Sequence, residues 1–363
     1  MPVKILHAAD FHLDSPFDGL SAELSAQRRA EQRELLHKLA ELANRERVQL
    51  VLLAGDLLDS AVSYHETTDA LTRAFSSINA RIFIAPGNHD YYCAKSPYAY
   101  IEFPENVHIF RSETIECVPL SELNCRVWGA GFNIPHCRPL LTGFQVPADN
   151  RTEIMVMHGE VGGDVYNGIS EQEIEFSGLD YLALGHIHAH RGISRAGKTH
   201  YAYSGCPEAR GFDETGKKGV LVGEVSAGAC ELRFVPLGGR EYNITDVNLT
   251  GCDDARAAIA AATESFSERD VCRILLRGEF DGRADTAALE KQFADRFFQF
   301  SVRDMTRPRR DIWGSAGADT LRGVFLREMR EKYDGADEEG RGRVALAVRY
   351  GLAALENGEE WQV

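Results

Sequence analysis

Five short apolar runs in this chain are each followed, within four residues, by a side chain that can bind a metal ion or carry a proton. The runs are Val3–Ala9, Val48–Ala54, Arg81–Ile84, Glu153–Met157 and Tyr181–Leu184. Runs of this length and composition are typical of buried strands. Helical patterns over about residues 21–46 and 64–79 separate the first three runs, which predicts right-handed strand–helix–strand units and a largely parallel sheet covered by helices.

The polar residues at the ends of these runs are expected to lie together. They are Asp10, His12, Asp56, Asn88, His89, His158, His186 and His188. In α/β sheets, ligands bind at the carboxyl ends of the strands. Residues 10 and 12 of an extended segment point to the same side, so both side chains can reach one ion. Each residue alone also fits an ordinary turn or exposed surface, but five such strand ends favour a shared site.

Oxygen and nitrogen ligands dominate this set. The candidate metal ligands are Asp10, His12, Asp56, Asn88, His158, His186 and His188. Seven ligands suit two octahedral divalent cations, with water or substrate oxygens in the open positions. Mixed carboxylate and imidazole ligation without thiolate favours Mn, Fe or Zn over a pure Mg site. We therefore predict two divalent metal ions, with Mn²⁺ as the first choice and Fe or Zn as alternatives.

The charge balance limits the range of functions. The chain has 55 Asp and Glu residues against 40 Lys and Arg residues, a formal net charge of −15. This balance argues against a general nucleic-acid coat protein, whose surface would be basic. It does not exclude a nuclease, because bound cations invert the local field of an acidic site.

Cysteine usage and hydropathy indicate a cytoplasmic protein. The eight cysteines are scattered without a C-x-x-C pair, so neither a zinc ribbon nor a disulfide framework is expected. No run of about 18 apolar residues is present, so no membrane association is expected. The first six residues fit a strand better than a signal peptide.

The motifs D-x-H, G-D-x-x-D, G-N-H-D, H-G and G-H-x-H follow one another over residues 1–190. In this order they resemble the calcineurin-like metallophosphoesterase superfamily. The resemblance implies an α/β fold with a layered core of β-sheets flanked by helices. It also implies that the ligands divide between two metals bridged by Asp56: Asp10, His12, Asp56 and His188 for one, and Asp56, Asn88, His158 and His186 for the other.

The chemistry of such a centre needs no serine or cysteine nucleophile. Two divalent ions about 3.5–4 Å apart polarise a phosphodiester and lower the pKa of a bridging water, and the resulting hydroxide attacks phosphorus in line. We expect His89, next to Asn88, to donate a proton to the leaving oxygen. Asp59 could orient the His89 imidazole.

Neighbouring residues indicate the substrate. Ser/Thr protein phosphatases carry Arg-Gly after the second aspartate motif and Glu after Asn-His, whereas this chain has Ser60-Ala61 and Asp90. The segment Tyr203–Gly219 resembles the strand-turn-strand that closes the core of SbcD-type DNA repair exonucleases, with most similarity to their YhaO-like bacterial branch. The resemblance implies a metal-dependent DNA exonuclease, with endonuclease activity left open.

Two other functions compete with that of a nuclease. A small-molecule or nucleotide phosphodiesterase could use the same dimetal site, although it would not need residues 203–363. A structural protein with a degenerate site is the weaker alternative, because all seven ligand positions are filled.

The resemblance and the patterns together predict three parts. A nuclease domain is expected over 1–240 and a small α/β accessory domain over 241–306. The third part, 307–363, begins with the basic linker Arg307–Arg310 and continues with two amphipathic helices.

The two amphipathic helices each have an apolar face. The first face carries Leu321, Val324, Phe325 and Met329, and the second carries Val344, Val348, Leu352 and Leu355. These faces either pack on each other or dock on an SbcC-like coiled-coil ATPase.

Basic residues near the motifs are candidates for DNA phosphate contacts. They are Lys95, Arg191, Arg210, Lys217 and Lys218. Exposed Lys and Arg residues are most often only solvated, so these are the weakest of the site assignments. The sequence leaves open the physiological metal, the polarity of digestion and whether the chain forms a homodimer.

Overall fold

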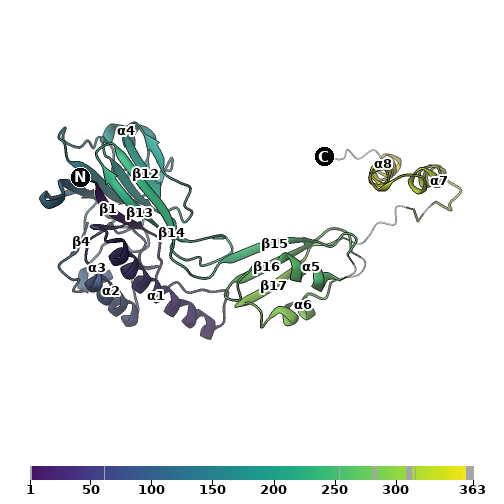
Figure 1. The fold of residues 1–363 in the computed structure, drawn as a ribbon, viewed down its shortest axis with the longest axis horizontal. Coiled ribbons are helices and arrows are strands. Elements are labelled where there is room, and N and C mark those ends of the chain that lie inside the picture. Colours follow the sequence, from purple (N-terminus) through teal and green to yellow (C-terminus); the bar gives the residue numbers. More distant parts are fainter. Residues whose placement is uncertain are drawn as a thin grey trace. The chain divides into compact units, whose positions relative to one another are not determined.

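The structure is a computed structural model that describes residues 2–60, 62–252, 254–280, 284–307, 313–314 and 316–356. Its helices are α1 (Ala22–Glu46), α2 (His65–Ser77), α3 (Pro97–Tyr100), α4 (Glu171–Ser177), α5 (Ala255–Ala262), α6 (Thr286–Phe293), α7 (Leu321–Asp334) and α8 (Glu338–Glu356). A 3₁₀ turn spans Ser121–Leu123. Figure 1 shows the arrangement of these elements.

Two six-stranded sheets form the centre of the larger of the two parts of the described chain. The first has the order β14 (Ala229–Pro236), β13 (Gly219–Ser226), β1 (Val3–Ala8), β2 (Leu50–Leu53), β3 (Arg81–Ile84) and β4 (Val107–Ile109). The second has the order β11 (Ser194–Ala196), β12 (Thr199–Tyr203), β10 (Tyr181–Gly185), β7 (Thr152–His158), β6 (Cys125–Gly129) and β5 (Glu116–Leu120). A short pair, β8 (Glu160–Val161) and β9 (Gly168–Ile169), lies outside both sheets.

The central strands of both sheets are parallel. β1, β2, β3 and β4 pair in parallel, as do β6, β7, β10 and β12. β13, β14, β11 and β5 pair antiparallel with their neighbours. The prediction of largely parallel strands is therefore confirmed, but the five apolar runs divide between the sheets, with β1, β2 and β3 in the first and β7 and β10 in the second.

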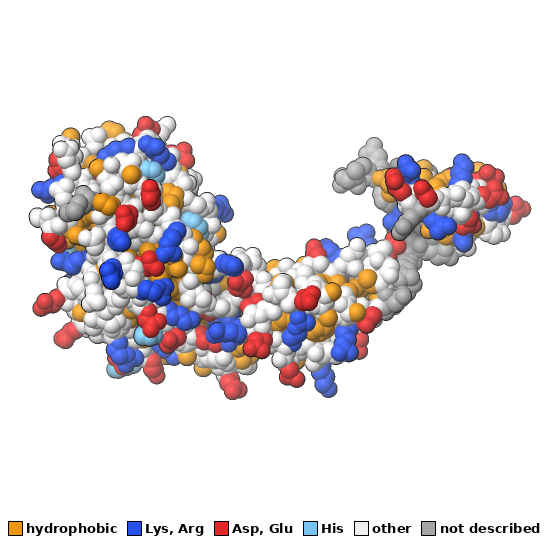
Figure 2. Space-filling model, in the orientation of Figure 1, with side chains coloured by type: hydrophobic (Ala, Val, Ile, Leu, Met, Phe, Trp, Pro, Cys, Tyr) orange, Lys and Arg blue, Asp and Glu red, His pale blue; other side chains and the backbone are white. Residues whose placement is uncertain are grey.

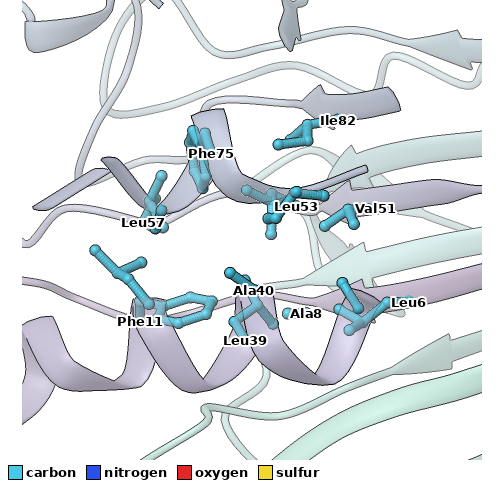
Figure 3. Packing of buried hydrophobic residues seen from close by; sticks show 14 of the residues in the cluster. Leu6, Ala8, Phe11, Leu39, Ala40, Val51, Leu53, Leu57, Phe75 and Ile82 are labelled. Carbon is cyan, nitrogen blue, oxygen red and sulfur yellow. The ribbon is translucent and has the colours of Figure 1, made fainter. Parts of the chain in front are cut away.

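Three apolar layers hold this part of the molecule together. Leu39 of α1 and Phe75 of α2 pack on Leu6 and Leu53 of the first sheet, as Figure 3 shows. The two sheets pack face to face through residues that include Val3, Ile5, Leu50, Leu52, Phe83, Val127, Ile154, Val156 and Ala183. Ile174 of α4 covers the outer face of the second sheet. These layers confirm the predicted core of sheets flanked by helices.

Local signals explain where α1 begins and ends. Ser21 caps its N-terminus by accepting a hydrogen bond from Leu24 N at 3.3 Å. Arg47 ends it with a left-handed backbone conformation, φ 54°. Leu35, Leu36 and Leu39 are buried against the sheet, and each contributes about 1.5–3 kcal/mol by leaving water.

The described residues divide into two compact units. The first comprises residues 1–244, 267–273 and 294–300, and the second comprises 245–266, 274–293 and 301–363. Residues 242–304 contain a three-stranded sheet of β15 (Tyr242–Asn248), β16 (Val271–Arg277) and β17 (Gln299–Asp304), together with the helices α5 and α6. The three-part division at residues 240 and 306 stays a prediction. Pro308–Arg310 of the predicted basic linker lie outside the described residues.

The two C-terminal helices pack on each other through part of their predicted apolar faces. Leu326, Val348 and Leu352 are buried in the cluster between them, with Phe325, Met329 and Val344 partly buried. Leu321, Val324 and Leu355 remain 72%, 46% and 42% exposed. Mutual packing therefore covers one part of these faces and leaves another part accessible.

The face of the molecule seen in Figure 2 carries charged side chains of both signs, with hydrophobic side chains between them. Within the part of the chain that the structure describes, no helix is long and apolar enough to cross a membrane.

A buried ion pair ties α1 to the loop after β12. Arg28 is completely buried and donates to Glu208 and, at 3.0 Å, to the carbonyl of Ala209. Glu208 is only 4% exposed, and its Oε2 has no hydrogen-bond partner among the described residues. The carboxylate therefore depends on Arg28 for most of its compensation.

We expect Arg28→Met to lower the free energy of unfolding by about 3–5 kcal/mol, because buried Glu208 loses its charged partner and keeps a hydrogen bond of 3.4 Å from Arg240 N. Urea unfolding followed by circular dichroism measures the effect. The double variant Arg28→Met/Glu208→Gln should recover a large part of the loss. A single variant within about 1 kcal/mol of the wild type would contradict this account.

Candidate metal centre

The loops after β1 and β2 run side by side and hold the first three candidate ligands. Beyond the two strands, Asp10 N donates to the carbonyl of Gly55 at 3.0 Å, and His12 N donates to that of Asp56 at 2.9 Å. Leu13 N donates to Leu57 O at 3.0 Å. These main-chain bonds fix Asp10, His12 and Asp56 relative to one another.

The backbone of these ligands is not extended. Asp10, His12 and Asp56 have φ values of 55°, 44° and 50°, which non-glycine residues rarely adopt. The prediction that residues 10 and 12 point to one side of a continuing strand was therefore wrong, because β1 ends at Ala8. Strained backbone of this kind costs about 1–3 kcal/mol per residue and clusters at functional sites.

The second sheet reaches the same place through the end of β10. His186 N donates to both carboxylate oxygens of Asp10, at 3.0 and 3.2 Å. Gly185 precedes it, and a Cβ there would collide with the carbonyl oxygen of Ala54. The close approach of the two sheets at this point requires glycine.

All seven predicted ligand residues come together at these strand ends. Ligand atoms of Asp10, His12 and His188 lie within 4.8 Å of one another, as do those of Asp10, Asp56 and His158. Asn88 Oδ1 lies 2.9 Å from His158 Nε2 and 3.3 Å from His186 Nδ1. The strand-end pattern therefore identified one cluster, although its members come from two sheets.

The outer nitrogens of three imidazoles are occupied by acceptors. His12 Nδ1 donates to Asp59 Oδ1 at 3.0 Å, and His158 Nδ1 donates to the carbonyl of Ala54 at 2.9 Å. His188 Nδ1 donates to Glu214 Oε1 at 2.6 Å. When the proton of a neutral ring lies on this outer nitrogen, its Nε2 presents a lone pair to the centre.

These inner atoms fit bound cations. His12 Nε2 and His188 Nε2 lie 3.2 Å apart, so a proton or a cation must lie between the two lone pairs. Asp56 Oδ2 lies 3.7 Å from His12 Nε2 and 3.5 Å from His158 Nε2. Carboxylate, amide and imidazole donors converging on one place, with outer partners fixing the rings, are the arrangement of a metal centre.

Burial and neighbouring charges shift the pKa values of the ligands in different directions: the pKa of His188 is raised, because Glu214 and Asp10 outweigh the effect of burial. Burial lowers the pKa of His12 and of His186 to about 4, so both rings are neutral at pH 7. Burial opposes ionisation of Asp56, but the nearby His158, His12 and His89 outweigh it and lower the pKa of that carboxyl. Burial raises the pKa of Asp10 to about 6.

His89 and Asp59 lie beside this cluster. The His89 ring is exposed and stands edge-on to His12, with 4.7 Å between the ring centroids. His89 Nδ1 donates to the main-chain carbonyl of Asp59 at 3.1 Å. The Asp59 carboxylate accepts from His12 instead, and the hydrogen bond of the His89 ring is to the main chain of Asp59.

Two of the five basic residues predicted to contact DNA are engaged near the cluster. Arg210 contacts Asp59, Glu214 and His188, and Lys218 Nζ donates to the carbonyl of His188 at 3.2 Å. Lys95, Arg191 and Lys217 are exposed.

The role of Glu214 was not predicted from the sequence. Its carboxylate is buried and holds His188, but it lies in a loop and not at the end of an apolar run. Nothing local distinguishes it from Asp213 or Glu208 in the sequence.

The role of Asp90, which is completely buried, was also not predicted. Its Oδ1 accepts hydrogen bonds from Gly87 N at 2.7 Å and Asp56 N at 3.2 Å. Its Oδ2 accepts from Leu57 N and Leu58 N and from the Tyr98 hydroxyl at 2.5 Å. Burial and the charge of Asp56 raise the pKa of Asp90, but five donors around two oxygens are the pattern of an ionised carboxylate. Asp at a turn after Asn-His was the available signal.

We expect Asp90→Asn to lower the free energy of unfolding by at least about 1–3 kcal/mol, because its amide NH₂ would face buried main-chain N–H donors. Divalent metal affinity should fall with it, since Asp90 holds the loops of both Asp56 and Asn88. Chemical denaturation and Mn²⁺ titration measure the two effects. The exposed Asp18→Asn is the control, and wild-type values for Asp90→Asn in both measurements would refute this role.

Comparison with known proteins places the chain among metal-dependent phosphoesterases. It is 28% identical over 330 residues to the uncharacterized metallophosphoesterase YhaO of Bacillus subtilis, an alignment that covers 86% of this chain and 80% of that protein. It is 25% identical over 244 residues to the DNA double-strand break repair protein Mre11 of Saccharolobus solfataricus, covering 61% of this chain and 60% of that protein. It is 24% identical over 261 residues to the SbcD component of the SbcCD nuclease of Bacillus subtilis, covering 59% of this chain and 64% of that protein.

The chain thus spans less than two thirds of the length of either the Mre11 or the SbcD protein. The predicted resemblance to the YhaO-like branch is confirmed by the first of these matches. The family model described as calcineurin-like phosphoesterase matches residues 3–190, which is more than half of the chain. The chain therefore belongs to the calcineurin-like phosphoesterase family.

Proposed function

We propose that this protein is a two-metal phosphodiesterase that hydrolyses DNA, as an exonuclease in DNA repair. The observation that carries the proposal is the set of three imidazoles whose outer nitrogens are occupied and whose inner nitrogens face Asp56, Asn88 and each other. Two divalent ions held there would polarise a phosphodiester and generate a hydroxide from water at neutral pH.

The ligands are proposed to divide into two positions that share Asp56. Its Oδ2 is near the Nε2 atoms of both His12 and His158, which suits a bridging carboxylate. Asp10, His12 and His188 would complete one position. Asn88, His158 and His186 would complete the other.

His89 is proposed as the general acid. Its Nδ1 donates to the carbonyl of Asp59, so the ring must be protonated at both nitrogens for Nε2 to give a proton to the leaving oxygen. Its ring is exposed, whereas the neighbouring His12 and His158 are buried, so a substrate can reach it. Asp59 would assist by orienting His89 through its main chain and His12 through its carboxylate.

DNA is proposed as the substrate because two relatives are named for DNA repair or nuclease activity, and the similarity to YhaO extends well beyond residue 190. Exposed Lys95, Arg191 and Lys217 are proposed to contact phosphates, and Arg210 and Lys218 lie nearer the metal cluster. Mn²⁺ is proposed as the metal.

An SbcC-like coiled-coil ATPase is the proposed partner of helices α7 and α8. Leu321, Val324 and Leu355 are apolar, exposed and outside the cluster that joins the two helices. An amphipathic helix of a partner could cover them.

The substrate proposal is tested with end-labelled duplex DNA, bis(p-nitrophenyl)phosphate and cyclic nucleotides, each with Mn²⁺ and with EDTA. We expect Mn²⁺-dependent shortening of DNA and turnover of the small phosphodiester. Rapid cyclic-nucleotide turnover with intact DNA would instead identify a nucleotide phosphodiesterase.

We expect His89→Asn to lower kcat by about 10²–10⁴-fold with little change in bound metal, because it removes the proton donor and none of the seven ligands. DNA cleavage rates and metal content by mass spectrometry measure the two effects. His65→Asn, on the exposed side of α2, is the matched control. Cleavage by His89→Asn at a rate near that of the wild type would show that another group donates the proton.

A further inference from the structure

The two proposed metal positions differ in what lies behind their histidines. His12 and His188 are each backed by a carboxylate, Asp59 and Glu214. His158 is backed by a main-chain carbonyl, that of Ala54. The first position therefore has an outer layer of charged side chains, which mutation can change.

Arg210 joins the two carboxylates of this layer. Its Nη1 donates to Asp59 Oδ1 at 3.2 Å, and its Nη2 donates to Glu214 Oε1 at 2.9 Å. Asp59 Oδ1 is also the atom that holds His12, and Glu214 Oε1 is also the atom that holds His188. Each of these oxygens is thus shared between one imidazole and one arm of the same guanidinium.

The main chain around Arg210 is fixed as well. Arg210 N donates to Glu214 Oε2 at 2.7 Å, and the carbonyl of the preceding Ala209 accepts from buried Arg28 on α1. The guanidinium is planar and places two donors in a rigid fork, so it can span two carboxylates at a set distance. Its side chain is 22% exposed, and both of its terminal nitrogens are engaged within the protein.

We propose that Arg210 is a positioning residue for one metal position. By bridging Asp59 and Glu214, it holds the Nε2 atoms of His12 and His188 at the separation that one divalent ion requires. The inference rests on the proposed two-metal centre. It assigns Arg210 to metal affinity, and no contact with the reacting phosphate is required. Loss of such an outer partner typically costs 10–100-fold in metal affinity.

The test is Mn²⁺ titration of the metal-free, full-length protein by calorimetry, with bound metal counted by mass spectrometry. We expect two ions in the wild type. Arg210→Met should keep one site at its original affinity and weaken the other by about 10–100-fold. Arg210→Lys should recover only part of the loss, because an ammonium group cannot bridge both carboxylates. Arg195→Met, an exposed arginine, is the matched control.

Double variants identify which position is weakened. Arg210→Met combined with Asn88→Ala should leave no site of original affinity, because Asn88 belongs to the other position. Arg210→Met combined with Glu214→Gln should resemble Arg210→Met alone. Two unchanged sites in Arg210→Met, or one intact site in the Asn88 double variant, would overturn the inference.

Failure of the proposed centre has a different signature. A wild-type protein that binds fewer than two ions would refute the two-metal centre itself, whatever Arg210 does. Circular dichroism melting checks that each variant folds. If Arg210→Met does not fold, Glu214→Gln alone replaces it in the test. This variant should weaken one site and leave the other unchanged. Two unchanged sites in Glu214→Gln would also overturn the inference.

Discussion

The centre depends on one buried carboxylate that is not among its ligands. Asp90 gathers main-chain N–H groups from the loop after β2 and the loop after β3, and the Tyr98 hydroxyl closes the set. Without it, the N–H groups of Gly87, Asp56 and Leu57 would lose their acceptor, and all three residues are buried. Asp56 and Asn88 keep their relative positions because both loops bind this one side chain.

The surrounding architecture sustains an arrangement that is unfavourable on its own. The left-handed backbone costs free energy at Asp10, His12 and Asp56. Imidazole lone pairs that face each other also cost free energy in the absence of cations. The apolar layer between the sheets and the packing of α1 and α2 on the first sheet supply the opposing free energy. A strained site of this kind can only exist on a large, well-packed core.

The sequence predicted the elements of the core well and selected polar residues that the fold brings together, because apolar runs and the polar residues after them are local signals. Arg81–Ile84 was recognised as a strand to the residue. The prediction failed where position depends on distant parts of the chain. Asp10 and His12 converge through main-chain bonds to the loop after β2 and not through strand geometry. Glu214 reaches His188 from a loop 26 residues away in the sequence, and no periodicity marks such a contact.

The hydrogen bond from His186 N to Asp10 joins the end of a strand in one sheet to the end of a strand in the other. The ligands of both proposed positions likewise come from both sheets. A bound ion would therefore hold the two sheets together, and its binding free energy would add to the stability of the folded protein. By the same linkage, a substitution that leaves a cavity between the sheets, for example at Val127 or Ile154, would weaken metal binding although every ligand is kept.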